Sequence, residues 1–157
     1  MFGQLNNDEI EELIKQKVVG RIGCHANGIT YVVPVSYAYD GTYIYGHSFE
    51  GMKLNIMRKN PQVCFQVDDT RNLANWQSVI CWGEFEELYT TVERESGLQK
   101  LVSRNLPIIT SQTMHISAQS PFTPDNLDAI EGIVFRIRLK EKTGRFEKSS
   151  DDFFYAT

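Results

Sequence analysis

Three side chains that can bind an anion lie close together in the first third of the chain. His47 and Ser48 end an alternating run, and Lys53 falls in the first turn of a helix predicted over residues 51–59. A helix N-terminus offers unpaired N–H donors and a partial positive charge, so it suits a phosphate. Lysine is unfavourable there unless an anion neutralises it. We therefore expect Lys53 and Ser48 to hold a phosphate and His47 to face the same pocket. The alternatives are a helix cap for Ser48 and a structural role for His47.

An apolar strand precedes this site. Between residues 31 and 39 bulky side chains alternate with mostly smaller ones, which is typical of a half-buried strand. Asp40-Gly41 predicts a tight turn, after which residues 42–48 form the second strand of the hairpin. A flat apolar strand beside a phosphate-sized pocket is what flavin mononucleotide (FMN) needs. Its floor would come from Val33, Pro34, Val35 and Ser36. Proline cannot donate to a sheet ladder, so Pro34 marks an edge, a bulge or a position approached by a ligand.

A series of short motifs runs in order through the chain from about residue 5 to residue 88. The motifs are Gly20-Arg21-Ile22-Gly23, Gly28, Pro34-Val35-Ser36-Tyr37, Ile44-Tyr45-Gly46-His47-Ser48, Met52-Lys53-Leu54 and Asn60-Pro61-Gln62-Val63-Cys64-Phe65. This series resembles the FMN-binding split barrels, which include pyridoxamine 5'-phosphate oxidase. Within that family the chain looks closest to the small bacterial branch that contains the 5-nitroimidazole resistance proteins.

The resemblance implies FMN as cofactor and a homodimer with the flavin at the subunit interface. It places His47 on the substrate side of the flavin, as the candidate catalytic residue. Ser78 falls where oxidase relatives carry a polar residue that reaches the flavin ring. Trp82 is expected in the core, at the dimer interface or against the flavin.

Vitamin B6 oxidation is not expected, because a second phosphate grip is missing. Relatives with that activity use a strand rich in arginine and lysine and a C-terminal arginine and tryptophan set. The equivalent strand here, residues 32–39, has no basic residue, and residues 148–157 lack that set. We expect hydride or electron transfer to a small oxidised organic acceptor such as a nitroaromatic. A non-catalytic flavin- or haem-binding module and a ligand-free interaction domain are the alternatives.

The pattern along the chain predicts a mainly β (α+β) fold. Helices are expected over residues 8–16, capped by Asn7 or Asp8, over 51–59 and over 90–105. Strands are expected over residues 18–26, 29–40, 42–48, 62–68, 78–88, with a bulge at Gly83, and 133–139. Residues 68–77 read as a polar turn, 107–127 as a long loop, and those from 144 onward as a solvated tail or an edge segment. Tight turns such as Asn27-Gly28 favour a six-stranded antiparallel split β-barrel with flanking helices, in one domain over residues 1–157.

Composition excludes several classes of function. The 157 residues carry a net charge of −4 with both signs interspersed, so nucleic acid is not an expected partner. No apolar run approaches the roughly 20 residues of a membrane span, and the N-terminus lacks the pattern of a signal peptide. Cys24, Cys64 and Cys81 show no metal-ligand spacing, so we expect free thiols, no metal site and a cytoplasmic protein.

Overall fold

The computed structural model describes residues 1–104, 127 and 129–149. Its helices are α1 (Asn7–Gln16), α2 (Met52–Lys59) and α3 (Thr91–Val102). Its strands are β1 (Phe2–Gln4), β2 (Val19–Ala26), β3 (Ile29–Ser36), β4 (Ala38–Tyr39), β5 (Tyr43–Ser48), β6 (Gln62–Asn72), β7 (Asn75–Leu88) and β8 (Ile133–Glu147). No helix in the described ranges is long and apolar enough to cross a membrane.

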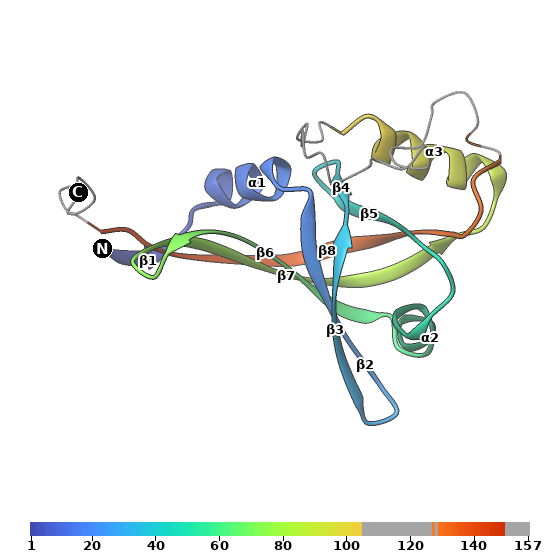
Figure 1. Ribbon diagram of the computed structural model, residues 1–157, viewed down its shortest axis with the longest axis horizontal. Helices are drawn as coiled ribbons and strands as arrows, with labels where there is room; N and C mark the ends of the chain where they lie inside the picture. Colours follow the sequence, from blue (N-terminus) through green and yellow to red (C-terminus); the bar gives the residue numbers. More distant parts are fainter. Residues whose placement is uncertain (105–126, 128, 150–157) are drawn as a thin grey trace, which may run out of the picture.

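The strands form one antiparallel sheet in the order β3-β2-β6-β7-β8-β5-β4, and β1 pairs with β8. The two ends of this order, β3 and β4, are consecutive in the chain and only Tyr37 separates them. The sheet therefore curls round on itself, and the β2–β3 hairpin projects away from the rest beside α2 (Figure 1). The predicted antiparallel split barrel with flanking helices is confirmed, with two short strands, β1 and β4, added to the six expected.

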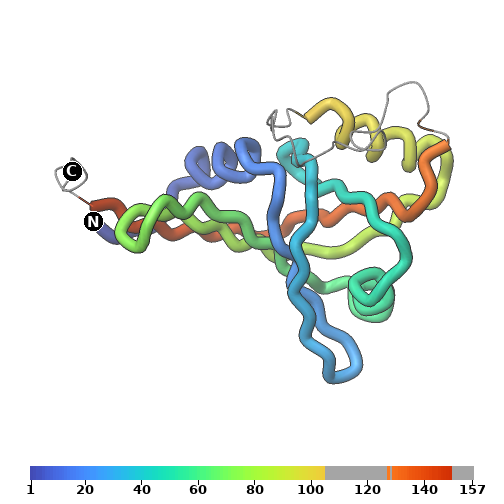
Figure 2. The backbone as a smooth tube through the Cα atoms, in the orientation of Figure 1, coloured from blue at the N-terminus to red at the C-terminus, as the bar shows by residue number. Residues whose placement is uncertain are grey.

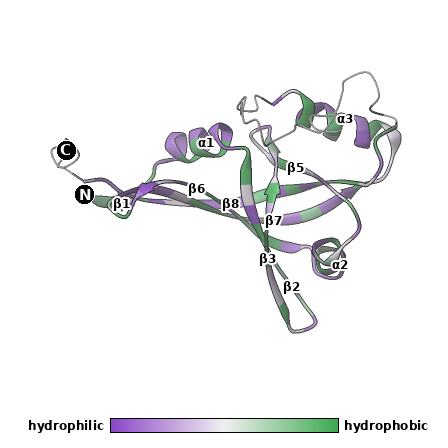
Figure 3. Ribbon diagram, viewed as in Figure 1, coloured by the Kyte–Doolittle hydropathy of each residue, from purple (hydrophilic) through white to green (hydrophobic). Residues whose placement is uncertain are grey.

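The core lies inside the curled sheet and under α1. Along β3 the inward residues Val33 and Val35 pack into the core, and Tyr37 continues this alternation past the end of the strand. The ring of Tyr37 packs edge-on against Phe65, with centroids 4.8 Å apart, and its hydroxyl donates to the carbonyl oxygen of Ile14 at 2.6 Å. This bond fixes the end of α1 to the corner between β3 and β4. Hydrophilic residues dominate the outward side of α1 (Figure 3).

The β6–β7 hairpin is longer than the sequence indicates. Residues 68–77, predicted as a polar turn, belong mostly to the two strands, which pair as far as Asn72 and Asn75. The turn itself is Leu73-Ala74, and Asn72 accepts from the backbone N–H of Ala74 at 2.9 Å. The polar side chains misled the prediction because strands that face solvent on one side can carry them.

The last strand also extends further than predicted. Residues 144–147 are neither a tail nor an edge segment, since β8 continues to Glu147 between β7 and β1 (Figure 2). Residues 150–157 lie outside the described part of the chain. The predicted bulge at Gly83 is confirmed, because the β7–β8 register shifts between Trp82 and Gly83. Helix α1 is capped by Asn6 rather than Asn7 or Asp8. The predicted loop over residues 107–127 lies outside the described residues except for Leu127.

Candidate functional site

The candidate anion site lies where β5 ends and α2 begins. His47 and Ser48 are the last residues of β5 and pair with Val134 and Ile133 of β8. Helix α2 starts after Gly51, and no side chain caps its N-terminus. The hydroxyl of Ser48 donates instead to the carbonyl oxygen of Phe49 at 2.9 Å. Ser48 is therefore not the helix cap, and the first N–H groups of α2 are not taken up by a capping side chain.

His47 is half-buried and faces two cations. Its Nε2 atom lies 2.5 Å from the carbonyl oxygen of Glu131, so this nitrogen carries the hydrogen. Burial lowers the pKa of His47, and the positive charges of Arg94 and Lys53 lower it further, against the hydrogen bond to Glu131. The imidazole is consequently neutral near pH 7. Lys53 and Arg94 are therefore both near enough to this ring to act on its pKa.

The sequence did not predict a role for Arg94, which comes from α3. Its guanidinium donates to the carbonyl oxygens of Gly132 at 2.9 Å and Ile130 at 3.0 Å. These bonds hold the turn whose Glu131 carbonyl contacts His47. Gly132 has a φ of +96°, and a β-carbon there would lie 2.8 Å from Nε2 of His47. A glycine directly before the last strand was the one signal in the sequence for this turn.

The four residues predicted to form an apolar floor all lie on strand β3, but they do not share a face. Among the described strands β3 pairs with β2 alone, so Pro34 sits on an edge strand, which is one of the three alternatives predicted for it. Pro34 and Ser36 are exposed, whereas Val33 and Val35 pack into the core. A ligand on this strand would meet the backbone of Val33 and Val35 rather than their side chains.

Ser78 and Trp82 lie on the same outward face of the sheet as Pro34. Trp82 pairs with Cys64, and Cys64 pairs with Gly23. Pro34 pairs with Arg21, which is two residues from Gly23 on β2 and therefore points to the same face. Trp82 is 42% exposed. A cavity of about 510 Å³ on this face is lined by Gly23, His25, Val32, Cys64 and Trp82, among others.

Polar side chains on the same outward face contact one another. Ser78 accepts from the side-chain amide of Gln66 at 3.1 Å, and Arg21 forms an ion pair with Asp68 at 2.8 Å. Gln66 was not singled out in the sequence. The hydrogen bond places the longer amide side chain of Gln66 beside Ser78, at the position where relatives carry a polar residue that reaches the flavin ring.

Apart from Val33 and Val35, which pack into the core, the predicted site residues form two groups within one chain. His47, Ser48 and Lys53, joined by Arg94, lie at the end of β5, and Pro34, Ser36, Ser78 and Trp82 lie on the face built from β3, β2, β6 and β7. Strand β8 stands between β7 and β5 in the sheet order. One group offers positive charge, and the other offers an exposed apolar surface.

The cysteines are free thiols, as predicted. Cys24 and Cys81 are buried and Cys64 is half-buried. Burial raises the pKa of Cys81 to about 12, so this thiol is protonated at neutral pH. Within the described part of the chain, no three His, Cys, Asp or Glu residues are grouped so that they could hold a metal ion.

Known proteins share both the sequence pattern and this fold. Residues 6–146 match a family model described as pyridoxamine 5'-phosphate oxidase. An uncharacterised protein of Rhizobium meliloti (strain 1021) is 30% identical over 87 residues, which are 55% of this chain and 58% of that protein. The alignment thus spans less than two thirds of that relative.

Solved structures agree over nearly the whole chain. An FAD-binding protein from Mesorhizobium loti has a TM-score of 0.71 and 28% identity, covering 94% of this chain and 99% of that one. A protein from Bacteroides thetaiotaomicron, named as a candidate 5-nitroimidazole antibiotic resistance protein, has a TM-score of 0.68 and 19% identity, covering 93% and 87%. The second likeness concerns the fold alone. The family predicted from the motifs is confirmed: the chain belongs to the pyridoxamine 5'-phosphate oxidase-like family of split-barrel proteins.

Proposed function

We propose that this chain is an FMN-binding oxidoreductase. The observation that carries the proposal is the N-terminus of α2, which no side chain caps, with the cations Lys53 and Arg94 near enough to His47 to lower its pKa. A dianionic phosphate would compensate both cations and accept from the N–H groups of the helix. The isoalloxazine ring would lie against the edge strand β3, where Pro34 leaves a point of the backbone without an N–H donor.

We further propose a homodimer with the flavin at the subunit interface. Val32 is 67% exposed and Trp82 is 42% exposed on the outward face of β3, β2, β6 and β7. A second copy packed on this face would remove that apolar surface from water. It would also bring Ser78 and Trp82 of one subunit toward the residues of the other subunit that would hold the phosphate. Both groups of predicted site residues would then contact the same cofactor.

The reaction proposed is reduction of a small nitroaromatic acceptor. A bound flavin supplies hydride transfer. Conversion of a nitro group to a nitroso group takes up one hydride and one proton and releases water. His47 is neutral near pH 7 and donates its N–H to Glu131, so it would shape the pocket around the acceptor, and the proton would come from solvent. The exposed side chains of β3, which include Thr30, Val32 and Ser36, offer no cation for a second phosphate. Pyridoxamine 5'-phosphate is therefore not the substrate we propose.

The test is anaerobic reoxidation of the reduced FMN complex. Mixing it with a 5-nitroimidazole in a stopped-flow instrument should restore the flavin absorbance faster than the same acceptor does with free reduced FMN. Pyridoxine 5'-phosphate should reduce the oxidised complex no faster than buffer. Tight flavin binding without accelerated reoxidation would reject the enzyme in favour of a flavin-binding module. Preferential retention of haem would favour the haem-binding alternative.

A further inference from the structure

The turn that joins β5 to α2 carries a carboxylate next to the proposed phosphate site. Glu50 lies in this turn, directly before Gly51, the N-cap residue of α2. Its side chain is 63% exposed, and the first turn of α2 contains no acidic residue. A negative charge at a helix N-terminus interacts favourably with the N–H groups there. Glu50 is therefore a potential competitor of the phosphate for the same donors.

Arg58, in the last turn of α2, binds this carboxylate through both of its oxygens. Its Nη1 atom donates to Oε2 of Glu50 at 2.7 Å, and its Nη2 atom donates to Oε1 at 2.9 Å. Two such bonds to one guanidinium fix the orientation of a carboxylate. Within the described residues, no hydrogen bond joins Glu50 to a backbone N–H of α2. The observed position of Glu50 thus leaves these donors to another anion.

Glu87 fixes the position of Arg58 in turn. It lies near the end of β7, where it pairs with Phe135 of β8, and its side chain is only 6% exposed. Nη2 of Arg58 also donates to Oε1 of Glu87, at 2.5 Å. A buried carboxylate without a partner is costly, so Glu87 keeps Arg58 beside the sheet. The hydrogen bonds to Arg58 lower the pKa of Glu50, which therefore stays charged at neutral pH.

Release of Glu50 from Arg58 would affect the phosphate in two ways. The freed carboxylate would accept from the first N–H groups of α2, which no side chain caps. It would also attract Lys53, three residues further along, which forms no ion pair within the part of the chain that the structure describes. Either contact would occupy a group that the proposed function assigns to the phosphate.

We propose that Arg58 is a positioning residue for phosphate binding, because it keeps Glu50 away from the N-terminus of α2. The N–H groups of the helix and the charge of Lys53 then remain available to the ligand. The inference rests on the proposed function for the identity of that ligand. The position of Glu50 itself is testable without any flavin.

The affinity for FMN relative to riboflavin tests this role in a series of variants. Glu87→Gln is the reference, because it removes the carboxylate that would stay buried and unpaired once Arg58 is lost. Its affinity ratio should lie within threefold of the wild-type ratio. Glu87→Gln/Arg58→Met should lower the ratio at least fivefold, and adding Glu50→Gln should return it to within twofold of the reference. A bridge that only stabilised the fold would show no such recovery, because the third substitution restores no contact.

A flavin-free test follows the backbone N–H signals of Met52 and Lys53 by NMR as the pH is lowered. In Glu87→Gln/Arg58→Met both signals should shift with the titration of a carboxylate. The shift should be at least twice as large as in the Glu87→Gln reference, and it should disappear when Glu50→Gln is added.

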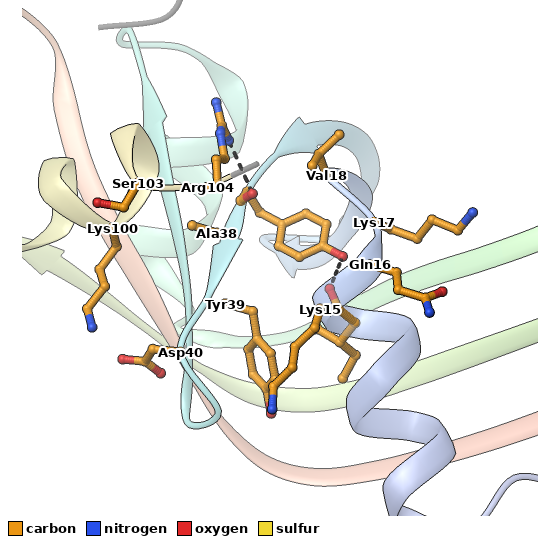
Figure 4. Close-up of a pocket in the computed structure, with 12 residues that line it drawn as sticks. Lys15, Gln16, Lys17, Val18, Ala38, Tyr39, Asp40, Lys100, Ser103 and Arg104 are labelled. Carbon is orange, nitrogen blue, oxygen red and sulfur yellow. Dashed lines mark hydrogen bonds between the residues drawn. The ribbon is translucent and has the colours of Figure 1, made fainter. Parts of the chain in front are cut away.

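Lys100→Met is the control for the loss of one positive charge elsewhere. Lys100 lies in the last turn of α3 and lines a separate cavity of about 550 Å³, between the C-terminal ends of α1 and α3 and the corner of β3 and β4. Figure 4 shows its exposed side chain among those around this cavity. The substitution should leave the affinity ratio within twofold.

Several results would overturn the inference. They are an unchanged ratio when Arg58 is removed, a loss that Glu50→Gln does not reverse, an equal loss in Lys100→Met, or N–H signals that do not follow the carboxylate. If the wild-type chain bound FMN no more tightly than riboflavin, the proposed phosphate site would fail instead. The NMR titration would then decide by itself whether Arg58 keeps Glu50 from the helix.

Discussion

Replacing Lys53 by methionine should remove most of the preference of this protein for FMN over riboflavin. The two flavins share the isoalloxazine ring and differ in the phosphate, so their affinity ratio isolates the phosphate contact. Lys53 lies in the first turn of α2, and its charge reaches His47 at the end of β5. Methionine keeps the length and the apolar stem of the side chain while it deletes the charge.

The expected magnitude follows from the surroundings of Lys53. A hydrogen bond to a charged group contributes roughly 1.5–3 kcal/mol, which corresponds to about 10- to 150-fold in affinity. Lys53 is only half-buried, so solvent screening moves the effect toward the lower end of that range. We therefore expect about a tenfold loss of FMN affinity. Riboflavin affinity should stay within about twofold, because no phosphate is involved.

Fluorescence quenching of each flavin, titrated with wild type and variant, measures the ratio directly. Lys59→Met is the matched control, because it removes the same charge from the exposed last turn of the same helix. It should leave both affinities within about twofold. If Lys53→Met weakened FMN and riboflavin equally, or if Lys59→Met had the same effect, the phosphate would not lie at the N-terminus of α2.

Three further predictions concern the titration of His47, its effect on stability, and the packing of a glycine against the core. An NMR titration should place the pKa of His47 below 6.5, and Arg94→Met should raise it by removing a neighbouring charge. Because the folded state keeps this ring neutral, the stability it contributes is present above pH 6.5 and is lost as the pH falls through the folded pKa. Separately, a β-carbon at Gly20 would lie 2.4 Å from a ring carbon of Phe65. Chemical denaturation should therefore show Gly20→Ala to be less stable by about 1–3 kcal/mol. Gly51→Ala should change stability by under about 0.5 kcal/mol, because a β-carbon there would lie 4.0 Å from the carbonyl oxygen of Phe49 and clash with nothing.

Local chemistry was enough to predict the features that depend on a few neighbouring residues. The Asn27-Gly28 turn has φ values of 52° and 77°, which is the left-handed conformation that this pair favours. The alternation along β3 places its larger side chains inward, as expected from a period of two. The missing N–H donor of Pro34 predicted an edge, a bulge or a position approached by a ligand, and Pro34 lies on an edge strand.

Long-range pairing decided what the sequence could not predict. The C-terminal part of β8 is polar, and it is a strand because β1 and β7 pair with it from either side. Arg94 has no motif around it, and it joins the site only because α3 packs near the turn at Gly132. The cavity between α1 and α3 likewise gathers residues that are far apart in the sequence.

The central claim, that this chain holds FMN, is tested most directly by an absorbance scan of the purified protein after FMN is added and the excess is removed by desalting. Retained bands at about 370 and 450 nm, with FMN rather than FAD recovered on denaturation, are the predicted result. A protein that leaves the column colourless, or that retains FAD and not FMN, would contradict it.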